Sequence, residues 1–290
     1  MLCCASANFN SKLTIRNTRY FTDQLGREVE ISFPPSRIIS VVPSQTELLA
    51  DLGLDDEVIG ITKFCVHPQK WLRAKTQVGG TKQLHRDQIA SLNPDLIIAN
   101  REENAKEQID ELAKLFPVWI SDVKTLNDAY VMMHAVGEIT GKQEAALALT
   151  EKIKNAFREW RTDSKGIKPK NLNSKLTCAY LIWNDPLMTI GGDTFIHHML
   201  GKAGFENVFS NLQRYPQISR DLLQEKNPDF LFLSSEPFPF RWQHADDMKK
   251  WFPHAEVLLV DGEMFSWYGS RMLKAPEYFR QLHQSIAALK

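Results

Sequence analysis

Apolar residues recur at three- and four-residue steps between Lys142 and Trp160, and this spacing predicts one amphipathic helix. Its interior holds neither Gly nor Pro, and Gly141 marks the end of a preceding helix. At a rise of 1.5 Å per residue such a helix would be roughly 30 Å long, enough to bridge two small domains. Its apolar stripe consists of Ala146, Leu149, Ile153, Phe157 and Trp160.

Before this helix, short aliphatic runs alternate with helical patterns. A polar turn between two apolar runs predicts a β-hairpin within 13–33. Strands are expected at 37–42, 58–61, 96–99 and 118–120, and helices at 46–52, 86–92, 105–115 and 126–139. Thr125 and Asp128 resemble a capping box for the last helix. Alternating strands and helices are typical of a parallel sheet covered by helices.

The chain after the long helix repeats this plan. Strands are expected at 176–183, 230–233 and 257–260, and helices at 195–200 and 276–289. Segment 85–100 aligns with segment 219–234 without a gap, since Asp87 and Asp221 differ by 134 positions, as do Asp95 and Asp229. Each copy is a short helix, an Asn-Pro-Asp turn and a buried strand. A duplicated α/β lobe is therefore predicted.

Four domain segments follow from this organisation. We expect an N-terminal segment with the hairpin at 1–36 and an α/β lobe at 37–141. The connecting helix would occupy 142–163, and a second α/β lobe with a closing helix would occupy 164–290.

Composition excludes several function classes. The 290 residues include 35 basic and 35 acidic ones, so overall charge gives no argument for nucleic acid or an anionic membrane. Four cysteines form neither a disulfide framework nor a C-x-x-C pattern. The first twelve residues lack the basic and apolar regions of a secretory signal, so a cytoplasmic location stays open.

The motifs of nucleotide-dependent or hydrolytic enzymes are absent. No G-x-G-x-x-G, Walker-type loop or G-x-S-x-G occurs, and no nucleophile–base pair is evident, so no catalytic residue and no cofactor are expected. The Gly-rich turns at 79–81 and 191–194 are expected to let the backbone approach a partner or ligand. His67 follows the carboxyl end of a strand, where α/β sheets bind ligands. One histidine alone does not make a metal site.

Aromatic residues gather at strand ends in the second half. Trp183, Tyr215, Trp267 and Tyr268, together with Arg271, are typical of a cleft for a large flat or amphipathic ligand. Loop aromatics that cap the core are the alternative interpretation.

Asp87 and Asp221 lie in the first turns of the two repeated helices. A carboxylate there stabilises a helix by roughly 0.3–1 kcal/mol, which is the purely structural interpretation. The functional alternative is a symmetric pair of acidic contacts, one on each lobe.

Several segments together resemble one known family. These are RIISVVPSQTELLADLGLDDEVIG, KFCVHP, VGGTK, NPDLII, ISRDLLQEKNPD and WYGSR. In order and spacing they resemble the vitamin B12 and ferric siderophore type of ABC-transporter substrate-binding proteins, the helical-backbone metal receptors. The resemblance extends from about Arg37 to Leu289. It implies two Rossmann-like α/β lobes with parallel sheets, joined by a single long rigid helix, with the ligand between the lobes.

The resemblance also implies residue roles. Phe64 matches an aromatic that contacts the corrin ring in B12-binding members, and Trp183 falls near another pocket aromatic. Tyr215 matches a pocket Trp, and Arg271 matches an Arg at the cleft. Gly80 stands where the B12 binder has an aromatic, and Trp267 stands where it has an acidic residue.

Asp87 and Asp221 fall where the family uses a Glu on each lobe to dock onto arginines of the membrane permease. Aspartate keeps the charge but is one methylene shorter. The expected partners are therefore an ABC-transporter permease and a small-molecule chelate, with no nucleic acid, and a monomer is expected.

The predicted function is capture of a metal chelate (corrinoid, haem or ferric siderophore) for an ABC importer, in the periplasm or at the cell surface. Two alternatives remain at this stage. One is a receptor for bare zinc or manganese ions that uses His67. The other is a cytosolic protein that handles a tetrapyrrole.

Overall fold

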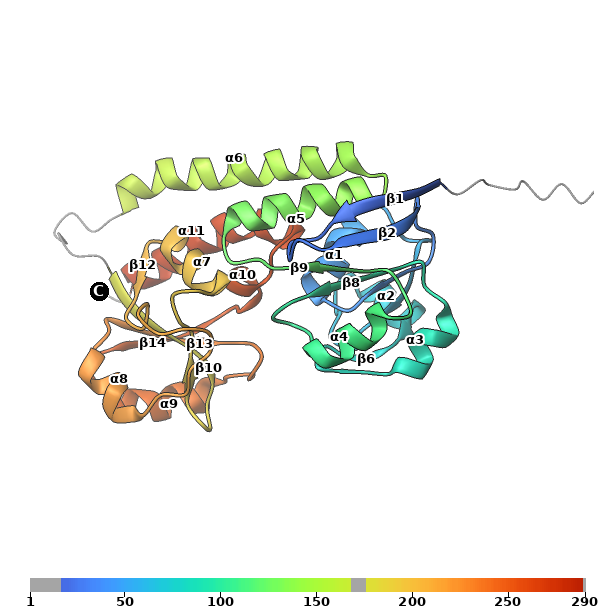
Figure 1. Cartoon of the computed structure of the whole chain (residues 1–290). Coiled ribbons are helices and arrows are strands. Elements are labelled where there is room, and N and C mark those ends of the chain that lie inside the picture. The colour runs from blue at the N-terminus through green and yellow to red at the C-terminus, as the bar shows by residue number, and fades with distance from the viewer. Residues whose placement is uncertain (1–16, 168–175, 289–290) are drawn as a thin grey trace, which may run out of the picture.

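The computed structural model describes residues 17–167 and 176–288, including their side chains except those of 163–167. Two α/β lobes lie side by side, and one long helix, α6 (Gln143–Ile167), runs along the same side of both (Figure 1). Among the described residues, no helix has the length and apolar character needed to cross a bilayer.

The N-terminal lobe contains a five-stranded sheet with strand order β5-β4-β3-β8-β9, in which every pairing is parallel. All five residues of the interior strand β8 are buried, as is typical of a sheet covered on both faces. The strands are β3 (Ile38–Ser40), β4 (Val58–Ile61), β5 (Thr76–Gln77), β8 (Leu96–Asn100) and β9 (Val118–Ser121). The helices are α1 (Pro43–Asp51), α2 (Gln69–Ala74), α3 (Arg86–Leu92), α4 (Lys106–Ala113) and α5 (Leu126–Ile139).

Two small antiparallel pairs accompany this sheet, β1 (Asn17–Thr22) with β2 (Glu28–Phe33), and β6 (Gly79–Gly80) with β7 (Gln83–Leu84). The first strand expected for the hairpin, at 13–15, lies outside the described residues. The helix expected from 46 begins earlier, at Pro43, because proline fits the first turn of a helix. The capping box of Thr125 and Asp128 is confirmed, with both of its hydrogen bonds present.

The C-terminal lobe has the strand order β11-β10-β13-β14, and β12 also pairs with β10. Only β11 pairs antiparallel. The strands are β10 (Leu176–Trp183), β11 (Met188–Thr189), β12 (Phe205–Asn207), β13 (Phe230–Ser234) and β14 (Glu256–Val260). The helices are α7 (Phe195–Ala203), α8 (Arg220–Lys226), α9 (Trp242–Trp251), α10 (Glu263–Ser266), the 3-10 turn η1 (Ser270–Leu273) and α11 (Ala275–Ala288).

The two lobes contain the same helix–turn–strand unit. Helices α3 and α8 both end at an asparagine in the left-handed region, with φ of 44° at Asn93 and 41° at Asn227. The aspartates that follow, Asp95 and Asp229, each accept a backbone N–H bond of 2.8 Å from the start of the neighbouring strand. The Asn-Pro-Asp turn therefore fixes the helix against the sheet in both lobes.

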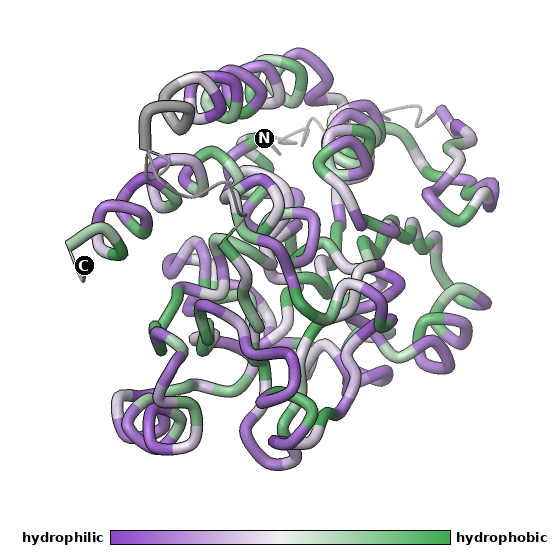
Figure 2. Tube along the Cα trace, turned by 90° about the vertical axis from the view of Figure 1, so that its left-hand side faces the viewer, coloured by the Kyte–Doolittle hydropathy of each residue, from purple (hydrophilic) through white to green (hydrophobic). Residues whose placement is uncertain are grey.

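Helix α6 contacts both lobes. Its 25 residues span about 38 Å at 1.5 Å per residue. The predicted stripe is confirmed, since Ala146, Ile153, Phe157 and Trp160 are buried and Leu149 is half-buried against the same core. Polar positions alternate with the stripe around the helix (Figure 2). The N-terminal half packs on α5. In the other half, the Trp160 indole N–H donates to the carbonyl of Lys202 at 2.8 Å, so α6 is a strut between the lobes.

Candidate functional site

The two lobes meet along a boundary below α6 (Figure 1), and the segment that carries Arg271 contacts α1 of the N-terminal lobe there. Three sets of polar contacts cross this boundary, centred on Glu102, Arg271 and His67. Their side chains come from loops that follow strands and from the short helices α1, α10 and η1. This is the position at which open α/β sheets bind ligands.

Glu102, two residues after β8, is the centre of the first contact. The Tyr215 hydroxyl donates to its Oε2 at 2.9 Å, and Arg214 forms an ion pair with its Oε1. Burial, followed by the charge of Glu102, raises the pKa of Tyr215, so this phenol stays protonated and remains a donor. Two C-lobe side chains therefore hold one N-lobe carboxylate.

The Gly-rich turn at 191–194 positions those two C-lobe residues. The Gly191 N–H donates to the carbonyl of Arg214 at 2.7 Å, and the Gly192 N–H donates to that of Leu212 at 2.9 Å. A Cβ at Gly192 would lie 2.1 Å from the carbonyl oxygen of Ser210. The close approach expected at this turn is thus made to the protein's own chain, and it presents Arg214 and Tyr215 to the other lobe.

Arg271 makes the second contact and is only 6% exposed. Its Nε and Nη2 donate to the two carboxylate oxygens of Glu47 in α1, at 2.8 and 2.7 Å. Its Nη1 lies 3.0 Å from Glu263 in α10. The guanidinium thus joins the lobes through protein carboxylates, and the direct ligand contact expected of it stays a prediction.

His67 makes the third contact. Its Nε2 lies 3.2 Å from Glu263 Oε1, and its ring meets the Trp267 ring edge-on at a centroid distance of 5.5 Å. Trp267 is buried, and its indole N–H donates to Glu236 at 2.9 Å. The structure therefore brings His67, Trp267 and Arg271 together around Glu263.

Glu236 is a boundary carboxyl group with a raised pKa. Burial is the main cause that raises its pKa to about 7, and the nearby carboxylates of Glu263 and Glu103 raise it further. Hydrogen bonds from Ser266 and Trp267 oppose that shift. Near neutral pH the group is consequently about half protonated.

Tyr268 is 5% exposed, and its hydroxyl has no hydrogen-bond partner of normal geometry. Burial raises its pKa, and the charges of Glu103 and Glu102 act in the same direction, while the Ser44 hydroxyl lowers it. The phenol therefore stays protonated and neutral.

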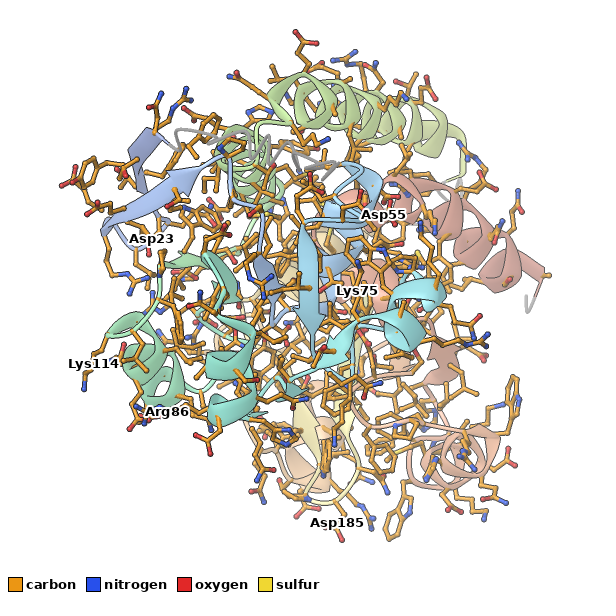
Figure 3. All side chains as sticks on the ribbon, turned by 90° about the vertical axis from the view of Figure 1, so that its right-hand side faces the viewer. Asp23, Asp55, Lys75, Arg86, Lys114 and Asp185 are labelled. Atoms are coloured by element: carbon orange, nitrogen blue, oxygen red, sulfur yellow. The ribbon has the colours of Figure 1, made fainter. Side chains whose placement is uncertain are left out.

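Phe64 and Trp183, in contrast, are exposed by 52% and 39%. Phe64 lies three residues after β4, with Lys63 Nζ 5.1 Å from its ring centroid. A Cβ at Gly80 would lie 3.0 Å from the Phe64 ring. Glycine at position 80 therefore leaves the space that this ring occupies. Trp183 ends β10 and packs edge-on against Phe238 at 5.6 Å. Asp185, just beyond it, lies far from α6 (Figure 3).

Asp87 and Asp221 are both exposed, in the first turns of α3 and α8. The two helices lie on different lobes, in the half of the molecule away from α6 (Figure 1). Asp87 and Asp221 thus occupy the same position in the repeated unit of each lobe, and their docking role stays a prediction.

Sequence reasoning missed the carboxylates of the boundary: Glu47, Glu102, Glu103, Glu236 and Glu263. The repeat register could have found two of them. Glu102 plus the repeat offset of 134 gives Glu236, so the alignment extends two residues beyond segments 85–100 and 219–234. No local pattern pairs Glu47 with Arg271, which is 224 positions away.

A bare-metal site requires three or four converging ligands. Among the residues that the structure describes, no group of three or more His, Cys, Asp or Glu side chains is arranged to hold a metal ion. The bare-ion alternative therefore lacks a donor set in this part of the chain.

Comparisons with known proteins agree with this geometry. A family model described as "Periplasmic binding protein" matches residues 38–251. The ABC transporter substrate-binding lipoprotein YvrC of Bacillus subtilis is 24% identical over 276 residues, covering 91% of this chain and 84% of that protein. The vitamin B12-binding protein of Pectobacterium carotovorum is 25% identical over 259 residues, covering 88% and 90%.

A periplasmic haem-binding protein from Pseudomonas aeruginosa has the same fold, with a TM-score of 0.74 and 20% identity. The match covers 87% of this chain and 94% of that one. The predicted fold class, two α/β lobes with parallel sheets, is confirmed by these likenesses and by the strand order.

The matched region includes the five strands of the N-terminal sheet, the C-terminal strands β10 to β13, and the boundary residues from Glu47 to Glu236. The chain is accordingly a solute-binding protein of an ABC transporter and not an enzyme, with a permease and a small molecule as partners. Its architecture, its repeated lobes and its matched sequence all lead to one assignment: the chain belongs to the periplasmic binding protein family.

Proposed function

We propose that this protein captures a metal chelate (a corrinoid, a haem or a ferric siderophore) between its lobes and delivers it to the permease of an ABC importer. The observation that carries the proposal is the exposure of two large rings, Phe64 and Trp183, at the carboxyl ends of the two sheets. Exposed aromatic faces of this kind bind flat or amphipathic ligands, and each can bury roughly 150–250 Å².

The polar residues support a ligand that arrives with its metal already coordinated. At the boundary, Tyr215, His67 and Trp267 each contact one carboxylate. No metal-binding group of three occurs among the described side chains. A chelate needs only shape and a few hydrogen bonds from its receptor.

Delivery is supported by the acidic pair. Asp87 and Asp221 are exposed on different lobes, and no ion pair within the described residues occupies either carboxylate. We propose that they contact basic residues of the permease, and that the protein works outside the cytoplasmic membrane.

The direct test is isothermal titration calorimetry with cyanocobalamin, haemin and ferric hydroxamates. Trp183→Ala and Phe64→Ala should each weaken the chelate that binds by roughly 5–100-fold, corresponding to about 1–3 kcal/mol. Trp242→Ala is the matched control, because Trp242 is 72% exposed at the start of α9 and should leave affinity unchanged. Binding of free zinc or manganese, with no response to any chelate, would contradict the proposal.

A further inference from the structure

Arg214 has an unusual backbone conformation for an arginine. Its φ is 57°, in the left-handed region, whereas the other non-glycine residues with positive φ in 17–167 and 176–288 are asparagines. Asparagine adopts this region readily and arginine does not. The turn at 191–194 holds Arg214 from both sides, because Asp193 Oδ1 accepts its N–H at 2.5 Å and the Gly191 N–H donates to its carbonyl at 2.7 Å. Backbone strain held in this way is typical of ligand-binding positions.

This conformation directs two neighbouring donors of the C-lobe to one carboxylate of the N-lobe. Arg214 Nη1 pairs with Glu102 Oε1, and the Tyr215 hydroxyl donates to Glu102 Oε2 at 2.9 Å. A guanidinium and a hydroxyl that donate to the two oxygens of one carboxylate make a charge-assisted carboxylate site. The protein itself supplies the carboxylate that occupies this site.

Arg214 keeps donors for a further carboxylate. Among the described contacts only its Nη1 donates a hydrogen bond, so Nε and Nη2 remain available, and the side chain is 43% exposed. Arg271 differs in both respects, since it is 7% exposed and its Nε, Nη1 and Nη2 all contact carboxylates. Of these two arginines that join the lobes, Arg214 is therefore the one that a ligand can reach.

Building on the proposed function, we propose that Arg214 and Tyr215 form a subsite for a peripheral carboxylate of the metal chelate, and that Glu102 is the internal competitor for this subsite. A ligand carboxylate takes the two donors from Glu102 by exchange of hydrogen bonds. Because the competitor occupies the donors, it lowers the apparent affinity for acidic chelates. Chelates with a free carboxylate are thus the class that this subsite recognises.

The test uses pairs of ligands that differ in carboxylates. N-succinyl ferrioxamine B carries a free carboxylate, and N-acetyl ferrioxamine B is its neutral counterpart. A cobalamin monocarboxylic acid with cyanocobalamin, and haemin with its dimethyl ester, form two further pairs. Titration calorimetry gives the affinity of the acid divided by that of its counterpart, and this acid ratio is the readout for the pair that binds.

Three variants change the subsite in different ways. Glu102→Gln removes the competing charge and should raise the acid ratio at least about tenfold. Arg214→Asn removes the guanidinium, while asparagine suits the left-handed backbone, and should lower the ratio about fivefold or more. Tyr215→Phe changes no charge but removes one donor, and should lower the ratio about threefold. Glu107→Gln, an exposed first-turn acid of α4, is the control that should leave the ratio unchanged.

The possible outcomes separate the subsite from simpler effects. Equal gains by both members of a pair in Glu102→Gln would mean that Glu102 only holds the lobes together, which would overturn the subsite. An unchanged acid ratio in Tyr215→Phe would reduce the effect to long-range charge and overturn it as well. In both cases chelate binding itself stays intact. Failure of every pair to bind the unmodified protein would contradict the proposed function, and the subsite with it. If Glu102→Gln does not fold, the acid ratios of Arg214→Asn and Tyr215→Phe decide the question.

Discussion

Replacing Arg271 with Met should destabilise the protein more than any surface charge change. The guanidinium side chain is 7% exposed, and its carboxylate partners Glu47 and Glu263 are 11% and 20% exposed. Methionine keeps much of the side-chain volume but leaves both carboxylates without their cation. Breaking a buried ion pair in this way costs about 3–5 kcal/mol.

The structure supports a value in that range. Three charge-assisted contacts of 2.7, 2.8 and 3.0 Å are lost together. At about 1.5–3 kcal/mol each they would sum to more, but neighbouring contacts are not additive, and the freed carboxylates recover part of their hydration. Lys274 Nζ, 3.8 Å from Glu47, compensates only in part.

Urea unfolding followed by tryptophan fluorescence measures this loss. The matched control is Arg86→Met, because the Arg86–Glu111 pair is 54% and 52% exposed and should contribute about 0–1 kcal/mol. Arg271→Lys should fall between the two, since lysine keeps the charge but cannot make the bidentate contact. If unfolding is not two-state, the lobes should separate into two transitions in Arg271→Met.

A double-mutant cycle completes the test. Glu47→Gln combined with Arg271→Met should be less destabilising than the sum of the single changes, by about 0.5–3 kcal/mol. The reasoning fails if Arg271→Met costs less than about 1 kcal/mol or if the cycle shows no coupling.

Three further predictions concern the acid group, the docking pair and the strut. Burial raises the pKa of Glu236 from 4.5 to about 7 in the folded protein. The contribution of this group to the free energy of unfolding is therefore full below pH 4.5 and is lost as the pH rises through 7. Urea unfolding should therefore show the wild type losing at most about 3 kcal/mol between pH 5 and pH 8 relative to Glu236→Gln; identical pH profiles would contradict this. Asp87→Asn and Asp221→Asn should lower uptake in a reconstituted transporter by roughly tenfold, equivalent to about 1.4 kcal/mol, without changing chelate affinity in calorimetry; weaker affinity would place these residues in the ligand site instead. Three glycines inserted after Leu149 in α6 should weaken chelate binding roughly tenfold, because the spacing of the lobes would no longer be pre-organised; unchanged affinity would mean that α6 does not set that spacing.

The regular part of the fold was predictable because its signals are local. The limits of α5, Leu126–Ile139, agree with the sequence prediction, since the stripe and the capping box define both the face and the start of this helix. Helix α9 (Trp242–Trp251) was missed because only Ala245 and Met248 of its ten residues are buried, which gives too weak a stripe. Helix α6 extends to Ile167, past the polar residues at which the prediction ended it.

Only some of the boundary carboxylates could be predicted from the sequence. Glu102 and Glu236 follow from the repeat, since equivalent positions in duplicated lobes come to equivalent places at the boundary. Glu47, Arg271 and Glu263 do not, because their contact joins α1 to the end of the chain through tertiary packing alone.

The aromatic residues show why residue type alone could not assign the ligand site. Trp183 is the last residue of β10 and Trp267 directly follows α10, so both lie at the ends of C-lobe elements and look alike as sequence signals. Trp183 pairs with Met188 at the end of β10, its indole N–H donates to the carbonyl of Asp185 at 3.0 Å, and the residue is 39% exposed. Trp267 is 6% exposed, and its N–H is used to hold Glu236. Under the proposed function the hydrogen bond of each indole distinguishes the two roles: Trp183 bonds to its own loop and keeps an exposed ring that we propose for the ligand, whereas Trp267 bonds to Glu236 and supports that acid. On this argument Trp267→Phe should act through Glu236, by raising its pKa, whereas Trp183→Phe should act on ligand affinity alone.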